Sequence, residues 1–168
     1  TDASAAYLQT AEELWNRESS ILSAFDDTWY VWKWKNTSDD EGALFFQQVP
    51  RWSYPERLAE QLCHQALAID PANRKIWGLL ICINLRQYRE SEAVINAPDL
   101  DEEARTFLAP FAERAYNGKV LGYPAGEDEL YEALARCLED QNSALSEVAV
   151  AVIEALEKNP TASVKEGA

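Results

Sequence analysis

The most apolar stretch of the chain covers residues 76–85, where Gly78 and Asn84 are the exceptions. A helix with one solvated face carries polar residues at every turn, and this stretch does not. We therefore expect a helix here that is buried on nearly all sides. The stretch is much too short to cross a bilayer, which takes about 20 apolar residues. The flanking sequence must supply neighbours on several sides.

Two different periodicities precede this stretch. Apolar residues recur at three- and four-residue steps over residues 3–25, which predicts an amphipathic N-terminal helix. From residue 28 the period changes to two, and aromatic and β-branched residues alternate as they do in a strand. Turn-forming residues 36–42 separate this strand from a second apolar run. The sequence predicts an aromatic β-hairpin over residues 28–50, with a helical hairpin as the alternative.

Residues 53–97 carry helical periodicity. Ser53 and Glu56 have the spacing of a capping box, in which the serine accepts from an amide and the glutamate reaches back. The helix that follows is expected to stop at Asp70-Pro71, because proline cannot continue the hydrogen-bond ladder. The central apolar helix should then run from residue 73 to 85, and a short turn should lead into another helix over 89–96.

Residues 99–160 are also expected to be helical. The segment 99–102 is a further possible cap, and apolar periodicity predicts helices over 128–139 and 143–158. Residues 161–168 read as a tail. The expected fold is mainly α, a single domain over residues 1–168 with one small hairpin.

Part of the helical region resembles a tetratricopeptide repeat, a helix pair of 34 residues. That family places small residues where its paired helices touch, an acidic-proline turn between repeats, and a tryptophan and a leucine on the next helix. The residues that match this pattern are Ala59, Ala66, Pro71, Trp77, Leu80 and Ala93. They cover about one and a half repeats.

The C-terminal helix pair is similar to a HEAT repeat. The matching residues are Leu138, Asp140, Asn142, Leu145 and Ala149. The order of a tryptophan-rich segment, a tetratricopeptide-like pair and a HEAT-like unit resembles bacterial HEAT-repeat proteins. Both resemblances imply a short α-solenoid of stacked helix pairs that binds other proteins.

Charge narrows the range of partners. The chain has a formal net charge of −14, which argues against nucleic acid, because that binding depends on Lys and Arg neutralising phosphates. Insertion into a membrane and binding to an anionic membrane surface are disfavoured as well. Basic partners are favoured, although solubility alone would explain the acidity.

The three cysteines, Cys63, Cys82 and Cys137, all fall within apolar helical patterns and are expected to be buried structural thiols. This usage favours a reducing compartment such as the cytoplasm, with an extracytoplasmic location as the alternative. No signal peptide or transmembrane stretch is apparent. The chain starts at Thr1 and contains no methionine, so it is either a processed product or a domain of a longer protein.

Residues suited to catalysis or metal binding are sparse. His64 is the only histidine, and it cannot readily pair with Cys63 because adjacent helical residues point about 100° apart. Acidic clusters occur at 39–41, 101–103 and 127–129, and the last two read as solvated helix starts. No zinc-ligand spacing, calcium loop or phosphate-binding glycine loop is present. We therefore expect no catalytic, metal-binding or cofactor-binding residues.

Aromatic residues are concentrated around the predicted hairpin. Two interpretations are open: these side chains pack the hairpin onto the helices, which we favour, or some of them form an exposed binding patch. The candidate partner-binding residues are Trp29, Trp32, Trp34, Arg51, Trp52 and Tyr54. The sequence thus predicts a non-catalytic interaction or scaffold module for a protein or peptide. The alternatives are a structural or regulatory domain of a larger repeat protein and an enzyme of unrecognised type.

Overall fold

The computed structural model describes five parts of the chain: residues 2–17, 29–35, 43–119, 126–139 and 143–158. The predicted hairpin turn, the second half of the predicted N-terminal helix, the Asp140–Asn142 turn and the predicted tail lie outside these residues, as does the acidic cluster at 39–41.

The described residues form six α-helices, one short 3-10 turn and a two-stranded sheet. In chain order they are α1 (Ala3–Trp15), β1 (Trp29–Lys35), β2 (Ala43–Val49), η2 (Arg51–Ser53), α2 (Tyr54–Ile69), α3 (Arg74–Ile95), α4 (Glu102–Lys119), α6 (Glu127–Glu139) and α7 (Ser143–Lys158). The strands are antiparallel, and Trp32 lies opposite Phe46. The mainly helical class and the β-hairpin are confirmed.

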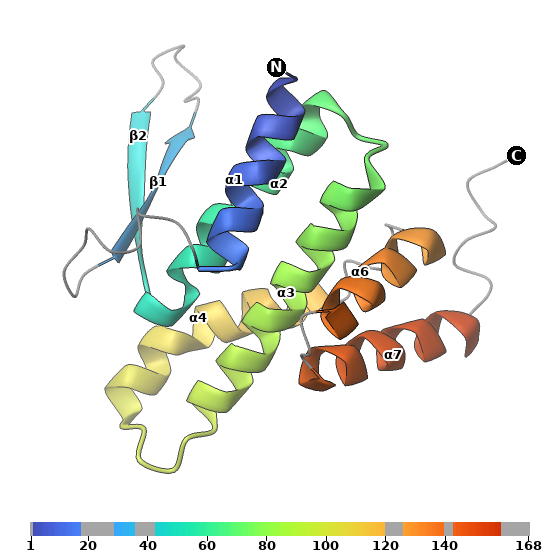
Figure 1. Ribbon diagram of the computed structural model, residues 1–168. Coiled ribbons are helices and arrows are strands. Elements are labelled where there is room, and N and C mark those ends of the chain that lie inside the picture. Colours follow the sequence, from blue (N-terminus) through green and yellow to red (C-terminus); the bar gives the residue numbers. More distant parts are fainter. Residues whose placement is uncertain (1, 18–28, 36–42, 120–125, 140–142, 159–168) are drawn as a thin grey trace, which may run out of the picture.

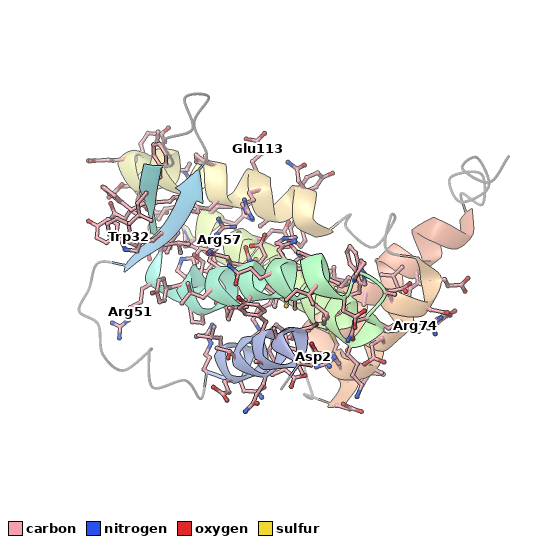
Figure 2. The ribbon with its side chains drawn as sticks, turned by 90° about the horizontal axis from the view of Figure 1, so that it is seen from above. Asp2, Trp32, Arg51, Arg57, Arg74 and Glu113 are labelled. Carbon is pink, nitrogen blue, oxygen red and sulfur yellow. The ribbon has the colours of Figure 1, made fainter. Side chains whose placement is uncertain are left out.

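Helix α3 is at the centre of the fold (Figure 1). It packs against α1, α2, α4, α6 and α7. Residues 78–85 are all buried, and so is Ile76, which confirms the prediction for the apolar stretch. Trp77 is half-buried and donates its indole N–H to the carbonyl oxygen of Pro71, at 2.9 Å. The hairpin and the α6–α7 pair lie on opposite sides of the helices around α3 (Figures 1 and 2).

Several helix boundaries agree with the sequence. Helix α2 ends at Ile69, immediately before Asp70. Helix α3 follows Asn73, whose side chain accepts a hydrogen bond from the amide of Lys75. At the start of α4, Asp101 accepts a hydrogen bond from the amide of Ala104, at 2.7 Å. Helices α6 and α7 begin within one residue of their predicted starts and end as expected.

The N-terminal helix is shorter than the sequence pattern indicated. Helix α1 ends at Trp15, whereas apolar periodicity predicted a helix to residue 25. Arg17 has a φ of 58°, in the left-handed region that ends helices. Its guanidinium contacts the carboxylates of Glu56 and Glu90. These ion pairs, made with helices remote in sequence, hold Arg17 in a conformation that periodicity does not reveal.

The predicted turn between residues 85 and 89 is wrong, because α3 continues unbroken to Ile95. The polar residues at the expected turn have partners on other helices. Arg86 lies over the ring of Trp15, with its guanidinium carbon 3.4 Å from the ring centroid. Gln87 is buried and donates to Glu60, at 3.2 Å. With these side chains satisfied inside the fold and no proline or glycine nearby, the helix has no reason to stop.

The predicted capping box is also wrong. The hydroxyl of Ser53 donates to the carbonyl oxygen of Pro50 and does not accept from the helix. Glu56 is fully buried and accepts from Arg17 instead of reaching back to Ser53. The spacing was right for a cap, but the carboxylate has a stronger partner in a guanidinium.

Candidate functional site

The two faces of the β-hairpin have different surroundings. Alternation along a strand places successive side chains on opposite faces. On one face, Val31 is 1% exposed, and together with Val49 it packs on Tyr54 of α2. Leu58 and Phe111 complete this small cluster. One face of the hairpin is therefore anchored to α2 and α4.

The opposite face of the hairpin is aromatic and exposed. Trp32 on β1 is 53% exposed, and Phe46, opposite it on β2, is 61% exposed. Their ring centroids are 5.3 Å apart, and Tyr30 lies 5.2 Å from Phe46 with the rings edge to face. Leu44 extends the same face and is also exposed. We call Tyr30, Trp32, Leu44 and Phe46 the aromatic face.

Tyr30 and Trp32, the two β1 residues of this face, also border a groove that is otherwise lined by α1 and α2. Its volume is about 300 Å³, within the range of small-ligand and peptide side-chain pockets. The hairpin contributes Tyr30 and Trp32 to its lining, and α1 and α2 contribute the rest. The residues that line it are Thr10, Leu14, Tyr30, Trp32, Tyr54, Leu58, Gln61, Leu62 and Gln65. We call this the hairpin groove. Among the side chains that the structure describes, those lining the groove are uncharged.

Some of the predicted partner-binding residues line this groove and others do not. Trp32 forms part of its wall and Tyr54 part of its buried floor. Trp52 is half-buried and Arg51 is exposed (Figure 2), and neither lines the groove. Trp29 and Trp34 belong to β1, but their side chains lie outside the description.

The favoured interpretation of the aromatic cluster as core is only partly right. Tyr54 is buried, as that interpretation requires. Tyr30, Trp32, Phe45 and Phe46 are exposed, so for them the expectation of core packing is wrong. The physical reason is that a two-stranded sheet at the edge of the fold has helices against one face and the aromatic residues are mostly on the other.

The sequence did not indicate the polar residues of the groove. Thr10 comes from α1, and Gln61 and Gln65 lie one turn apart on α2. The side-chain oxygen of Gln61 is buried, with no hydrogen-bond partner within the described parts of the chain. A buried acceptor without a donor is unfavourable by about 1–3 kcal/mol. The sequence feature that could have indicated them is the spacing of the two glutamines, which lie four residues apart and therefore on one face of the helix.

A buried polar cluster lies behind the groove and is centred on Glu60 of α2. This carboxylate accepts from Arg57 at 2.9 Å and from Gln87 at 3.2 Å, and Arg114 of α4 also donates to it. Figure 2 shows Arg57 between α2 and α4. Burial by itself would raise the pKa of Glu60, but His64, with its Nε2 3.8 Å away, Arg57 and Arg114 together lower it to about 2. The cluster ties α2 to α3 and α4.

A second polar cluster joins α1 to α2 and α3. Arg17 donates to Glu56 at 2.9 Å and to Glu90 at 3.2 Å. Arg86 lies 3.7 Å from Glu56 and donates to the carbonyl oxygen of Trp15. Burial, and then the nearby charge of Glu56, raise the pKa of Glu90 to about 7 in spite of Arg17 and Arg86.

The geometry at the cysteines and the histidine does not suggest a nucleophile pair. Cys63 is buried, and burial raises the pKa of its thiol to about 12. His64 is exposed, beside Glu60. All three cysteines are buried, which confirms that expectation. In the residues that the structure describes, no three His, Cys, Asp or Glu side chains come together as metal ligands would. The helices described include none with the length and hydropathy needed to span a bilayer.

Comparisons of the chain with protein-family models, with curated proteins and with solved structures found no match.

Proposed function

We propose that the protein is a non-catalytic interaction module that binds an extended segment of a partner protein in the hairpin groove. The observation that supports this most is the exposure of Trp32, which lines the groove, and of Phe46, whose ring lies beside that of Trp32. Large aromatic side chains left in water carry a free-energy cost that a partner can remove, and tryptophan is enriched in binding hot spots.

The chemistry of the groove suggests the kind of segment that it would accept. Its walls are apolar and aromatic, which suits an aliphatic or aromatic anchor side chain. Gln61 and Gln65 place side-chain amides in the lining, and these can hydrogen-bond the backbone of a bound segment. The net charge of −14 favours basic residues on either side of the anchor. The proposed ligand is thus a peptide with one large apolar residue flanked by lysine or arginine.

The resemblances to tetratricopeptide and HEAT repeats support the same proposal. Proteins of these types are stacked helix pairs that bind partners without catalysis. Under this proposal α2 and α3 correspond to a tetratricopeptide-like pair, α6 and α7 to a HEAT-like pair, and the whole to a short solenoid with a hairpin added at one end.

The test is a selection of peptides followed by a matched pair of variants. Peptides enriched from a random display library on the wild-type protein would be labelled and titrated by fluorescence anisotropy. Trp32→Ala removes a ring from the groove wall. Phe45→Ala removes a ring of similar exposure from the other face of the same hairpin. Both variants should first show wild-type circular dichroism.

We expect Trp32→Ala to weaken binding at least tenfold, which corresponds to about 1.4 kcal/mol or more. Phe45→Ala should stay within about twofold of the wild type. Selected peptides should share an apolar anchor. The proposal fails if no peptide is enriched, or if both variants bind the selected peptides as well as the wild type does.

A second candidate is a structural domain that stacks on a further helix pair through α6 and α7. The observation in its favour is that Tyr131, Leu138 and Val150 are exposed on these helices. Tyr131 and Leu138 are seven residues apart, so they lie on one stripe of α6. This candidate predicts association that depends on Leu138, whereas peptide capture in the groove should not depend on that residue.

A further inference from the structure

Helices α3 and α6 approach each other closely on faces made of small residues. On α3 these are Gly78 and Cys82, one turn apart, and on α6 they are Ala133 and Cys137, also one turn apart. A Cβ atom added at Gly78 would lie 2.5 Å from the Cγ atom of Glu132, closer than any normal contact. The glycine therefore permits the approach that brings the two cysteines together.

The two thiols are in direct contact. Their Sγ atoms are 3.6 Å apart, and both residues are fully buried. The Cys82 thiol also donates to the carbonyl oxygen of Ala133, at 3.2 Å, which fixes its sulfur on the side facing α6. The sulfurs would need to approach by only about 1.5 Å to form a disulfide. The cysteines come from helices 55 residues apart in sequence, so no local constraint imposes this contact.

We propose that Cys82 and Cys137 are a redox-responsive dithiol that a peroxide converts to a disulfide linking α3 to α6. In the first step one sulfur attacks the peroxide O–O bond, becomes a sulfenic acid and releases water, or an alcohol from an organic peroxide. In the second step the other thiol attacks the sulfenic sulfur, the S–S bond forms and a second water leaves. Each sulfur loses one electron overall, and the peroxide accepts both. A dithiol reductant reverses the change by exchange.

The contact makes pairing faster than further oxidation. Both sulfurs are shielded from solvent, so a peroxide reaches them only when α6 moves away from α3, a local opening of the kind that hydrogen exchange detects. Once one sulfur has reacted, the partner thiol is already beside it and competes favourably with a second peroxide from solution. Cys63 is also buried, on α2, but it lies outside the contact between Cys82 and Cys137. It serves as an internal control.

The disulfide would anchor the C-terminal pair α6–α7 to the central helix. It would close a large loop, and such cross-links stabilise chiefly by restricting the unfolded chain. We expect the melting temperature to rise by roughly 5–10 °C on oxidation. Helix α6 lies on the opposite side of the central helices from the hairpin (Figure 1). A failure of this proposal would therefore leave the proposed peptide binding untouched, and the reverse also holds.

The experiment uses the full chain, first reduced and then treated with a modest excess of hydrogen peroxide. The protein is unfolded in the presence of iodoacetamide, and its mass and peptide map are recorded. We expect one alkylated cysteine, Cys63, and a disulfide-linked peptide pair containing Cys82 and Cys137. Dithiothreitol should restore three alkylatable thiols. Cys63→Ala should leave the disulfide and the rise in melting temperature intact, and Cys137→Ala should abolish both.

Three results would overturn the proposal. The first is three alkylatable thiols after peroxide treatment. The second is a disulfide that contains Cys63 or joins two chains. The third is sulfinic or sulfonic acid at Cys82 or Cys137 in place of a disulfide. Each can be read from the wild-type protein, so the conclusion does not depend on the Cys137→Ala variant being folded.

Discussion

Helix α3 and the β-hairpin both carry runs of large apolar side chains, but the fold covers them differently. Residues 78–85 of α3 are buried, because the other helices that the structure describes all pack against α3. The hairpin is held through Val31 and Val49, while Trp32 and Phe46 on its other face are exposed. An apolar stretch indicates that a face needs a partner. Whether the same chain supplies that partner depends on how many layers surround the element.

The largest expected effect is the loss of a core side chain from α3. Leu80 is fully buried, so Leu80→Ala removes burial and leaves a cavity. We expect the free energy of unfolding to fall by about 3 kcal/mol or more, measured by urea denaturation. Trp32→Ala removes a larger side chain, but that side chain is half-exposed. We expect this substitution to lower the free energy of unfolding by about 1 kcal/mol or less. Equal losses in the two variants would contradict the contrast between the two regions.

The sequence predicted α3 and the hairpin for different reasons. The apolar stretch could be interpreted as buried because it has no polar side. The hairpin could be recognised by its period of two, but that period does not say which face is covered. Val31 and Trp32 are neighbours in sequence, and Trp32, which has the larger side chain, is the exposed one. Which face of the hairpin is covered depends on where α2 and α4 lie, and that is a property of the tertiary structure.

The second half of α3 shows a further limit of sequence reasoning. Arg86 and Gln87 resemble turn or surface residues, yet Gln87 is buried and Arg86 lies over Trp15. Their partners, Glu60 and Trp15, are on other helices. The same holds for Glu56, which matched a capping box but pairs with Arg17. Polar contacts between residues far apart in the sequence leave no periodic pattern, so this part of the fold could not be predicted.

The second-largest expected effect concerns the polar cluster around Glu60, which contacts Gln87 of α3. Glu60→Gln keeps the shape of the side chain but removes the charge that balances Arg57, which is 4% exposed. A buried cation without its counter-charge is destabilising, and we expect a loss of about 2 kcal/mol in the free energy of unfolding. Glu113→Gln is the matched control, because Glu113 is exposed on α4 and points away from the helices (Figure 2).

The control should change stability by about 0.5 kcal/mol or less, as surface substitutions usually do. If Glu60→Gln were as mild as Glu113→Gln, the cluster would not contribute to holding α2, α3 and α4 together. The apolar contacts of α3 would then account for the packing by themselves.

The smallest effect concerns pH and Glu90, at the C-terminal half of α3. Its pKa is raised to about 7 from an ordinary 4.5 by burial and by the charge of Glu56. Because the folded protein holds this proton more tightly than the unfolded chain does, Glu90 stabilises the fold fully below pH 4.5. That contribution is lost as the pH rises to about 7. Since the carboxylate is partly exposed and faces Arg17, we expect a change of about 1 kcal/mol.

Urea denaturation of the wild type and of Glu90→Gln between pH 4.5 and 8 isolates this contribution from the many other carboxylates. The glutamine resembles the protonated glutamate, so the variant should match the wild type near pH 4.5 and be the more stable protein near pH 8. Parallel stability curves would show that Glu90 is not perturbed. A divergence of the expected sign would show that the polar half of α3 stabilises the fold in a pH-dependent way, whereas the buried residues 78–85 contribute without a carboxylate to titrate.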